Sequence, residues 1–497
     1  MRPTLTLMLV CTLIAGPALA AEERIVPASD RKAIGVTIYN HDLALVKDRR
    51  SIDLGTGAHT LAFREVSARI RPETVLVRAD GLRVHEQNFE YDLLNPQALL
   101  RKYVGREVTL IDRHPTTGEE KARQVRVLSA GDGVVLQAGD RIETEISGRL
   151  VYPDVPANLR DRPTLTMAVD NERAGQQEVE VSYLTGGLSW RADYVAELNG
   201  DDSRLDVNGW VTLTNESGVS YPDARLQLVA GDVHVVEEAG RRFRTLGEDA
   251  VEMAAAAPEM REESLFEYHL YTLERPTTIA DNQKKQVALL QAAGVACRKE
   301  YLLDGQGAGF RAQTADGGHR LPVTVWVEVR NDQASGLGLP VPAGVARVYK
   351  KDAGGRLQFV GEDRLAHTPE NEVIRLRLGD AFDVTAERRQ TDFRWLDDAG
   401  DRVEQGASAP SSGQPAAVHL TDTDSKPKRS ESAWAITLKN ARPEAVTVRV
   451  RETLPGDWQI LEESAAHTKA SADAAVWQVL VPAKGSAQLT YRVRVRH

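Results

Sequence analysis

Apolar and polar residues alternate at period two through much of the chain, a pattern typical of half-buried β-strands. From Ala33 to Leu54, for example, two alternating runs flank a turn at Asn40–Asp42. Such runs recur to the C-terminus, separated by Gly, Pro and Asp turns, and are densest between Gly336 and Arg389. The pattern predicts an all-β, mainly antiparallel fold with several β-sandwich-like domains in series and few short helices.

Two local signals refine this prediction near the N-terminus. The segment from Tyr91 to Gly105 carries leucines at roughly helical spacing, and Gly105 can end a helix, so we expect a helix there. Before it, Asp80–Gly81 separates two alternating runs, which predicts a β-hairpin. After it, short strands up to Glu145 predict a small antiparallel meander.

A weak internal repeat consists of three segments that each begin with Trp and end with Asn. A short Asn side chain can satisfy a turn, and Trp often faces a sandwich core, so we expect these rings to be buried. Exposed rings would instead suit sugar binding. The repeat indicates either duplicated β-sandwich units or the independent use of similar residues at the same kind of turn. The segments are Trp210–Asn215, Trp326–Asn331 and Trp434–Asn440.

Changes in composition set the predicted domain boundaries. Residues 237–267 combine an alanine run with acidic clusters, which predicts a mobile insertion. Residues 397–430 are rich in Gly, Ser, Pro and charge, which is typical of a linker. The predicted order is a signal peptide (1–20), an N-terminal β-domain (21–162), a central β-domain with the insertion (163–396), the linker, and a C-terminal β-sandwich-like domain (431–497).

The N-terminus has the features of a secretory signal. Arg2 precedes an apolar core from Leu5 to Ala15, and Ala18–Ala20 matches a small-x-small cleavage pattern. We therefore expect export to the periplasm or beyond, with a mature chain beginning at Ala21. No later segment approaches about 18 consecutive apolar residues, so no transmembrane segment is expected after cleavage.

The chain has two cysteines, Cys11 and Cys297. Cys11 lies inside the signal core after Val10, which disfavours lipidation, and its removal leaves no partner for a disulfide. The neighbours of Cys297 are Arg298 and Lys299, which would lower a thiol pKa and suit a nucleophile. We favour the alternative of a partly buried, inert thiol.

Other candidates for chemistry are weak. His367 and Glu370 could ligate a metal ion, but Pro369 prevents a helical arrangement, so a polar turn is favoured. Asp232 and His234 share one side of a strand and could form an acid–base pair. Adjacent Glu362 and Asp363 face opposite sides of a strand, which argues against a glycosidase pair. We predict no catalytic, cofactor-binding or metal-ligating residues, while Asp232, His234 and His367 stay open.

Charge gives one further surface candidate. The formal net charge is −10, which argues against nucleic acid as a partner. Arg492, Arg494 and Arg496 share one side of the last strand, and Arg449 and Arg451 repeat the pattern upstream. We favour a solvated face balanced by local acids. The alternative is a docking surface for an anionic envelope polymer or an acidic partner.

Several segments resemble an uncharacterised exported bacterial family, the domain of unknown function four-one-three-nine, some members of which are described as mucoidy-inhibitor-like. The resemblance implies an all-β protein of a Gram-negative bacterium and carries over no site residues. The matching segments are Tyr183–Tyr194, Gly209–Tyr221, Leu228–Val233, Pro340–Asp352, Leu357–Glu372, Leu378–Arg389, and the last domain with its ITLKN and VTVRVRETLPGDW runs.

We therefore expect an exported structural or interaction protein of the cell envelope, without a cofactor, whose partner is an envelope protein or polysaccharide. The alternative is a hydrolase of envelope glycans with a site assembled from residues distant in sequence. Whether the chain is an enzyme stays open, because such sites leave no local motif.

Overall fold

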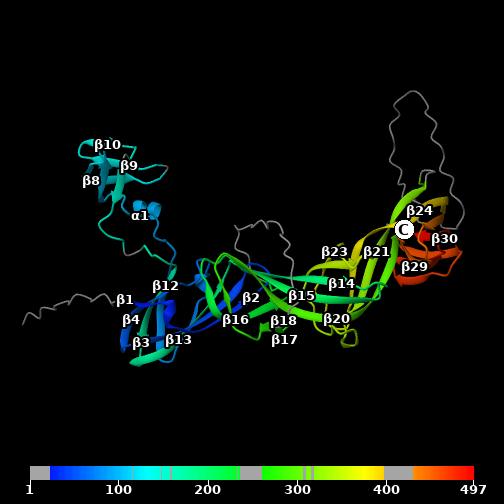
Figure 1. The fold of residues 1–497 in the computed structure, drawn as a ribbon, viewed down its shortest axis with the longest axis horizontal. Helices are drawn as coiled ribbons and strands as arrows, with labels where there is room; N and C mark the ends of the chain where they lie inside the picture. The colour runs from blue at the N-terminus through cyan, green and yellow to red at the C-terminus, as the bar shows by residue number, and fades with distance from the viewer. Residues whose placement is uncertain are drawn as a thin grey trace, which may run out of the picture. The chain divides into compact units, whose positions relative to one another are not determined.

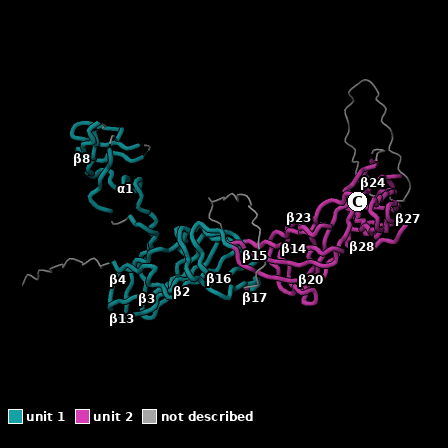
Figure 2. The backbone as a smooth tube through the Cα atoms, viewed as in Figure 1, with its two compact units in different colours: residues 1–190, 213–235, 263–285 teal, residues 191–212, 236–262, 286–497 magenta. Residues whose placement is uncertain are grey.

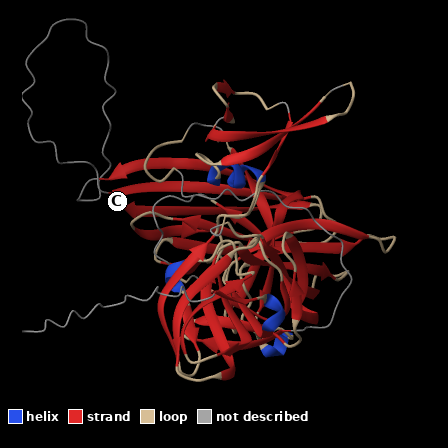
Figure 3. Cartoon of the chain, turned by 90° about the vertical axis from the view of Figure 1, so that its left-hand side faces the viewer, coloured by secondary structure: helices blue, strands red, loops and turns tan. Residues whose placement is uncertain are grey.

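The fold is that of a computed structural model, which describes residues 23–114, 116–131, 133–146, 148–156, 159–231, 233–234, 260–305, 309–314, 318–396 and 429–497. Strands dominate these residues, as the red ribbons of Figure 3 show. The all-β prediction is confirmed. The helical elements are α1 (Pro96–Lys102) and the 3-10 helices η1 (Ala28–Asp30), η2 (Pro72–Thr74) and η3 (Gln333–Ser335).

The chain divides into two compact units, coloured separately in Figure 2. Unit 1 comprises residues 1–190, 213–235 and 263–285, and unit 2 comprises residues 191–212, 236–262 and 286–497. Four of the boundaries, at 190/191, 212/213, 262/263 and 285/286, fall inside strands, so none of these four is a linker of the kind that composition indicates. The domain boundaries proposed from the sequence remain predictions.

Unit 1 contains a four-stranded and an eight-stranded sheet, most of whose strands are labelled in Figure 1. One has the order β1 (Glu23–Val26), β4 (Gly57–Arg64), β12 (Thr164–Asn171), β6 (Leu82–Glu90). The other has the order β17 (Met260–Leu265), β18 (Tyr268–Leu273), β16 (Tyr221–Ala230), β2 (Arg31–Ile38), β3 (Ala44–Leu54), β13 (Gly175–Thr185), β5 (Leu76–Arg78), with β19 (Thr277–Ile279) beside β16.

The C-terminal part of the predicted mobile insertion at 237–267 is instead a strand. Residues 260–265 form β17, which pairs with β18. Residues 237–259 of that segment lie outside the described residues, as does the greater part of the predicted linker.

The chain segment between β6 and β12, two strands that pair with each other, forms a separate five-stranded sheet. The predicted meander is present, and the last strand returns beside the first. The helix α1 packs on it through Leu100, and Tyr103 follows the helix into the same apolar cluster. The order is β10 (Arg141–Glu143), β9 (Val135–Ala138), β8 (Glu120–Ser129), β7 (Glu107–Arg113), β11 (Gly148–Val151).

The predicted helix is confirmed, but it is shorter than Tyr91–Gly105. The Asn95 side chain accepts the N–H of Ala98 at 2.8 Å, and Pro96 occupies the first turn. This pair of residues is a strong helix start, since Pro lacks the N–H that a first turn leaves unpaired. Helical spacing alone did not reveal that the start lies after Asn95.

The predicted hairpin at Asp80–Gly81 is wrong in its pairing. The turn is present, and Gly81 has a positive φ of 73°. However, β5 pairs with β13 and β6 pairs with β12, so the two strands enter different sheets. A turn signal reports a change of chain direction; it does not determine which strand each arm then pairs with.

Unit 2 is built on one long mixed sheet. Its order is β23 (Leu357–Leu365), β22 (Gly344–Lys351), β14 (Leu188–Leu198), β15 (Arg204–Asn215), β20 (Gln283–Asp304), β21 (His319–Arg330), β24 (Val373–Leu396), β25 (Arg429–Asn440), β30 (Gly485–Arg496), β27 (Asp457–Glu463), and β26 (Val446–Thr453), β29 (Ala474–Val481) and β28 (Thr468–Ser471) pair beside this path.

A buried ion pair lies in the apolar core of unit 2. The Arg388 guanidinium donates to both carboxylate oxygens of Glu452, at 2.7 and 3.0 Å. The same guanidinium lies 3.5 Å from the ring centroid of Trp434. Because both charges are nearly inaccessible to water, each depends on the other for stabilisation.

Three buried asparagines at strand ends make the same set of hydrogen bonds. The strand-end asparagines are Asn215, Asn331 and Asn440. Each side-chain amide donates to one carbonyl of the following turn at 2.8–2.9 Å and to two successive carbonyls much later in the chain, at 3.4 and 2.9–3.1 Å. The acceptors are Val219, Ile279 and Ala280; Leu339, Thr368 and Pro369; and Glu444, Val481 and Pro482.

The backbone repeats as well. Two residues after the last accepting carbonyl, each chain segment adopts a left-handed conformation, at Asn282, Asn371 and Lys484, with φ of 54°, 71° and 47°. A long strand then begins. Agreement in both the amide contacts and the left-handed residue favours repeated β-units over independent solutions to one turn.

The expectation of buried Trp rings holds for only one of the three segments. Trp434 is buried, whereas Trp210 and Trp326 are half-buried. Two side chains on a strand lie on the same face of the sheet when their residue numbers differ by an even number. Trp434 lies six residues before its buried Asn and shares its face, whereas Trp210 and Trp326 lie five residues before theirs and point to the other face.

We predict that Asn440→Ala lowers the free energy of unfolding of unit 2 by about 1–3 kcal/mol, because buried carbonyls lose their donor. Urea unfolding followed by tryptophan fluorescence measures this. The matched control is Gln488→Ala, at an exposed position of β30. Equal effects of the two substitutions would contradict a structural role for the amide.

Candidate functional site

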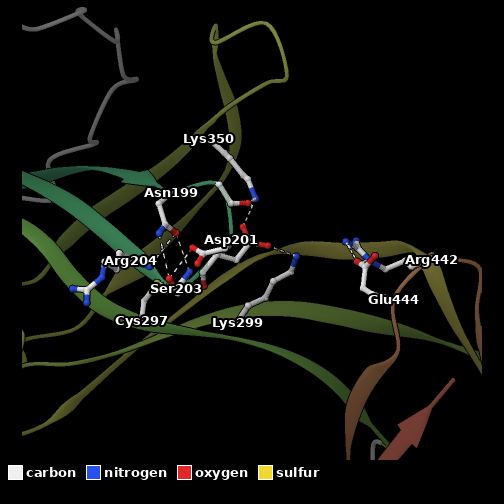
Figure 4. A network of polar contacts seen from close by, with 11 residues as sticks. Asn199, Asp201, Ser203, Arg204, Cys297, Lys299, Lys350, Arg442 and Glu444 are labelled. Atoms are coloured by element: carbon white, nitrogen blue, oxygen red, sulfur yellow. Dashed lines mark hydrogen bonds and ion pairs between the residues drawn. The ribbon is translucent and has the colours of Figure 1, made fainter. Parts of the chain in front are cut away.

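The candidate nucleophile Cys297 lies on β20 against the turn that joins β14 to β15. Figure 4 shows the turn residues around it. The thiol contacts the Asp202 carbonyl at 3.6 Å, and Asp202 itself pairs with Lys299 at 2.8 Å and with Lys350. Burial, and then the negative charges of Asp202 and Asp201, raise the pKa of the thiol to about 11. The chain therefore holds Cys297 as an unreactive thiol.

The segment from His367 to Glu370 is a structural turn. The ring nitrogen Nδ1 of His367 accepts the Ala343 N–H at 3.2 Å, and the next two carbonyls accept from Asn331. Across the described residues, no group of three His, Cys, Asp or Glu side chains is arranged to hold a metal ion.

The remaining predicted pairs do not assemble into a site. Glu362 pairs with Arg347 at 3.1 Å, while the Asp363 carboxylate accepts the Arg377 N–H at 2.8 Å, so adjacent residues serve different partners. His234 is exposed, and Asp232 lies outside the described residues.

The predicted arginine stripe is divided between strands that are not neighbours. The last strand, β30, pairs with β25 and β27, whereas β26, which carries Arg449 and Arg451, pairs with β20 and β29. Arg492 pairs with Asp392 at 2.8 Å. Arg494 donates twice to Glu431, at 2.6 and 2.8 Å. Local acids thus balance much of the stripe.

Glu431 is the buried centre of this arrangement, with a side chain only 1% exposed. Burial raises the pKa of its carboxyl, but hydrogen bonds from Arg394 and Arg494 outweigh burial and hold the pKa below its ordinary value. The arginines therefore neutralise a structural carboxylate.

A polar cleft in unit 1 is the strongest candidate for a binding site. Its floor is one face of the β3–β13–β5 sheet, where Arg49, Glu180 and Arg78 stand in a single cross-strand row. Glu178 lies two residues from Glu180 and shares its face, while Val179 between them is fully buried on the other.

Two turns wall the cleft. Arg173 comes from the β12–β13 turn and Asp80 from the β5–β6 turn. The Glu172 N–H donates to the Gly81 carbonyl at 2.8 Å, which joins the turns. The open cleft has a volume of about 580 Å³, within the range of small-ligand sites. Its charged lining is Arg49, Arg78, Arg173, Asp80, Glu178 and Glu180.

Ion pairs in the cleft are loose. Arg49 approaches Glu178 and Glu180 at 3.6 and 3.5 Å, and Arg173 approaches Asp80 at 3.6 Å. Arg78 has no ion pair or side-chain hydrogen bond with another described residue. By contrast, Asp48 on the same strand as Arg49 pairs with Arg31 and Arg50 at 2.8 and 2.7 Å. The cleft thus presents guanidinium groups that are weakly engaged.

Sequence reasoning missed the cleft. Its residues come from positions 49, 78–80 and 173–180, which only sheet pairing brings together. The available signal was the pair Glu178 and Glu180 beside Gln176, a polar face on a strand whose other face is apolar.

Comparison with models of known protein families identifies the family of this chain. A family model described as Domain of unknown function (DUF4139) matches residues 179–497, well over half of the chain. The chain belongs to the DUF4139 family. The resemblance stated from the sequence is thereby confirmed. No curated protein matches the chain. The DUF4139 match begins within β13, so most cleft residues precede it.

No helix in the described part of this DUF4139 protein is long and apolar enough to cross a membrane.

The raised pKa makes a testable prediction about Cys297. In a chain carrying Cys11→Ser, iodoacetamide should alkylate Cys297 at pH 8 about a hundredfold more slowly than a free thiol, because little thiolate is present. The rate should climb until about pH 11, and urea-unfolded chain is the control. A thiol whose pKa is raised by folding stabilises the fold below its unfolded pKa, so stability should fall as the pH rises towards 11. A rate that levels off below pH 9 would contradict the assignment.

Arg494→Glu tests the structural account of the stripe. We predict a loss of about 3 kcal/mol of unfolding free energy, because a second carboxylate then stands beside the buried Glu431, which keeps only Arg394 as its cation. The control, Arg496→Glu, changes the same charge at an exposed position of β30. Since the pKa of Glu431 is lowered, its contribution should be present above about pH 4.5 and disappear as the pH falls through that lowered pKa. An Arg494→Glu chain that is stable but altered in partner binding would instead support docking.

Proposed function

We propose that this DUF4139 protein is an exported protein of the cell envelope that binds an acidic polysaccharide in the polar cleft of unit 1. The observation that carries the proposal is the loose pairing of Arg49 and Arg173 and the unpaired state of Arg78 among the described residues. The secretory signal at the N-terminus supports export.

The chemistry of the lining suits a uronate-containing chain. A guanidinium group can bind a carboxylate through two parallel hydrogen bonds. Carboxylates and amides such as Glu180 and Gln176 accept hydrogen bonds from sugar hydroxyls, and the Gln176 amide also donates. No aromatic ring lines the described cleft. Recognition therefore rests on ion pairs and hydrogen bonds, and added salt should weaken it.

The test is calorimetric titration with a hexasaccharide of uronic acid, beside a neutral hexasaccharide of the same linkage. We expect the acidic sugar to bind more tightly and its affinity to fall with added NaCl. Arg78→Gln should weaken binding about tenfold, because a charge-assisted pair is lost. Folding should be unaffected, since Arg78 has no ion pair or side-chain hydrogen bond among the described residues to lose.

The matched control is Arg126→Gln, an exposed arginine of β8 that also has a loose ion pair, at 3.6 Å from Glu107. It should leave binding unchanged. Equal affinity for the neutral and acidic sugars, or equal effects of the two substitutions, would overturn the proposal.

A glycan hydrolase is the second candidate, because the cleft carries carboxylates from more than one element. Asp80 stands on a turn, and Glu178 and Glu180 stand on β13. Hydrolysis of a glycosidic bond requires carboxylates on both sides of that bond. Release of reducing ends from the acidic hexasaccharide, lost in Glu180→Gln, would favour this function over binding alone.

A further inference from the structure

We propose that the first half of β23, residues 357–360, accepts an extended apolar strand from a partner protein, which adds to the sheet of unit 2. This surface is separate from the polar cleft and does not depend on its function. The sequence Leu-Gln-Phe-Val lies at one end of the long sheet, where β22 pairs with β23 on one side.

The free part of β23 is unusually apolar. Leu357, Phe359 and Val360 are 48%, 56% and 37% exposed. The seven other strands at the ends of the four strand orders given above each have at most one exposed large apolar side chain, and each contains at least one charged residue, whereas the three-residue β19, beside β16, has neither. Charged residues commonly protect an edge strand from unintended pairing. Residues 357–360 contain none.

The second half of β23 is already covered by β24. The Arg377 N–H donates to the Asp363 carboxylate at 2.8 Å. The Leu378 carbonyl lies so close to Gly361 that a Cβ atom there would stand 2.3 Å from it. Residues 357–359 pair with β22, and Val360 is bulged out of that register; apart from this pairing, the backbone of residues 357–360 has no hydrogen bond to another described residue. The available edge is thus four residues long.

The size and charge of this edge identify its occupant. Folded partners that form a stable complex bury about 1,600 Å² in total, far more than four edge residues offer. An added peptide strand instead gains affinity from backbone hydrogen bonds and specificity from alternate side chains. The cations of this hairpin each have an acidic partner: Lys350 pairs with Asp202, Lys351 with Glu197, and Arg356 approaches Asp352. An uncharged strand with apolar side chains therefore fits, and the Tyr349 and Phe359 rings, 5.6 Å apart, offer an apolar contact.

The probe is a capped hexapeptide of alternating threonine and valine, titrated against the full chain and followed by hydrogen exchange. We expect saturable binding and slower exchange of the amides at residues 357–360. The fully N-methylated peptide, which cannot donate backbone hydrogen bonds, should not bind.

Phe359→Lys should lower the affinity of the chain for the hexapeptide about tenfold, since it places a charge at the edge. Phe359 is exposed, so the variant should fold. The matched control is Leu480→Lys, at a position 66% exposed on β29, which should bind normally. Three results would overturn the proposal: no saturation at millimolar peptide, equal binding of the N-methylated peptide, or light scattering that shows a dimer dispersed by Phe359→Lys, which would assign the edge to a second copy of this chain.

Discussion

Desolvation of charge is the constraint on which both units depend. An ion that leaves water loses several kcal/mol of solvation, so it must find a partner within the fold. In unit 1 the buried Asp48 carboxylate receives two guanidinium groups, from Arg31 and Arg50. In unit 2 Arg388 and Glu452 stabilise each other beside the Trp434 ring. These buried pairs are close, at 2.7–2.8 Å, whereas the more exposed pairs of the polar cleft lie at 3.5–3.6 Å, and this contrast is the basis of the proposed glycan site.

The same requirement extends to the backbone. A strand that ends inside a sandwich leaves carbonyl groups without the ladder that satisfied the residues before them, and unpaired buried carbonyls destabilise the fold. The strand-end asparagines Asn215, Asn331 and Asn440 meet this need by joining one turn to a second, remote turn. One polar side chain thereby fixes two loops at once. Repetition of this device explains how a chain with one free cysteine in its described part stabilises many strand ends without disulfides.

The sequence predicted those features that depend on neighbouring residues. Period-two alternation predicted the strands, and the spacing of leucines predicted α1, although the Asn95 cap set its true start. The Trp–Asn spacing also distinguishes the buried ring from the half-buried ones. A Trp six residues before a buried Asn shares the buried face of the strand, whereas a Trp five residues before it lies on the other face. Strand pairing between distant segments could not be predicted: Asp80–Gly81 turns the chain between two sheets, and Arg49, Arg78 and Glu180 meet only because β3, β13 and β5 are adjacent.

The central claim is that the weakly paired guanidinium groups of the cleft bind carboxylates of an acidic glycan. A crystal structure of the chain soaked with a uronic acid hexasaccharide tests it most directly. The account predicts a sugar carboxylate within hydrogen-bonding distance of the Arg78 guanidinium, between the two turns that carry Asp80 and Arg173. A sugar bound elsewhere on the chain, with the cleft occupied by solvent alone, would contradict it.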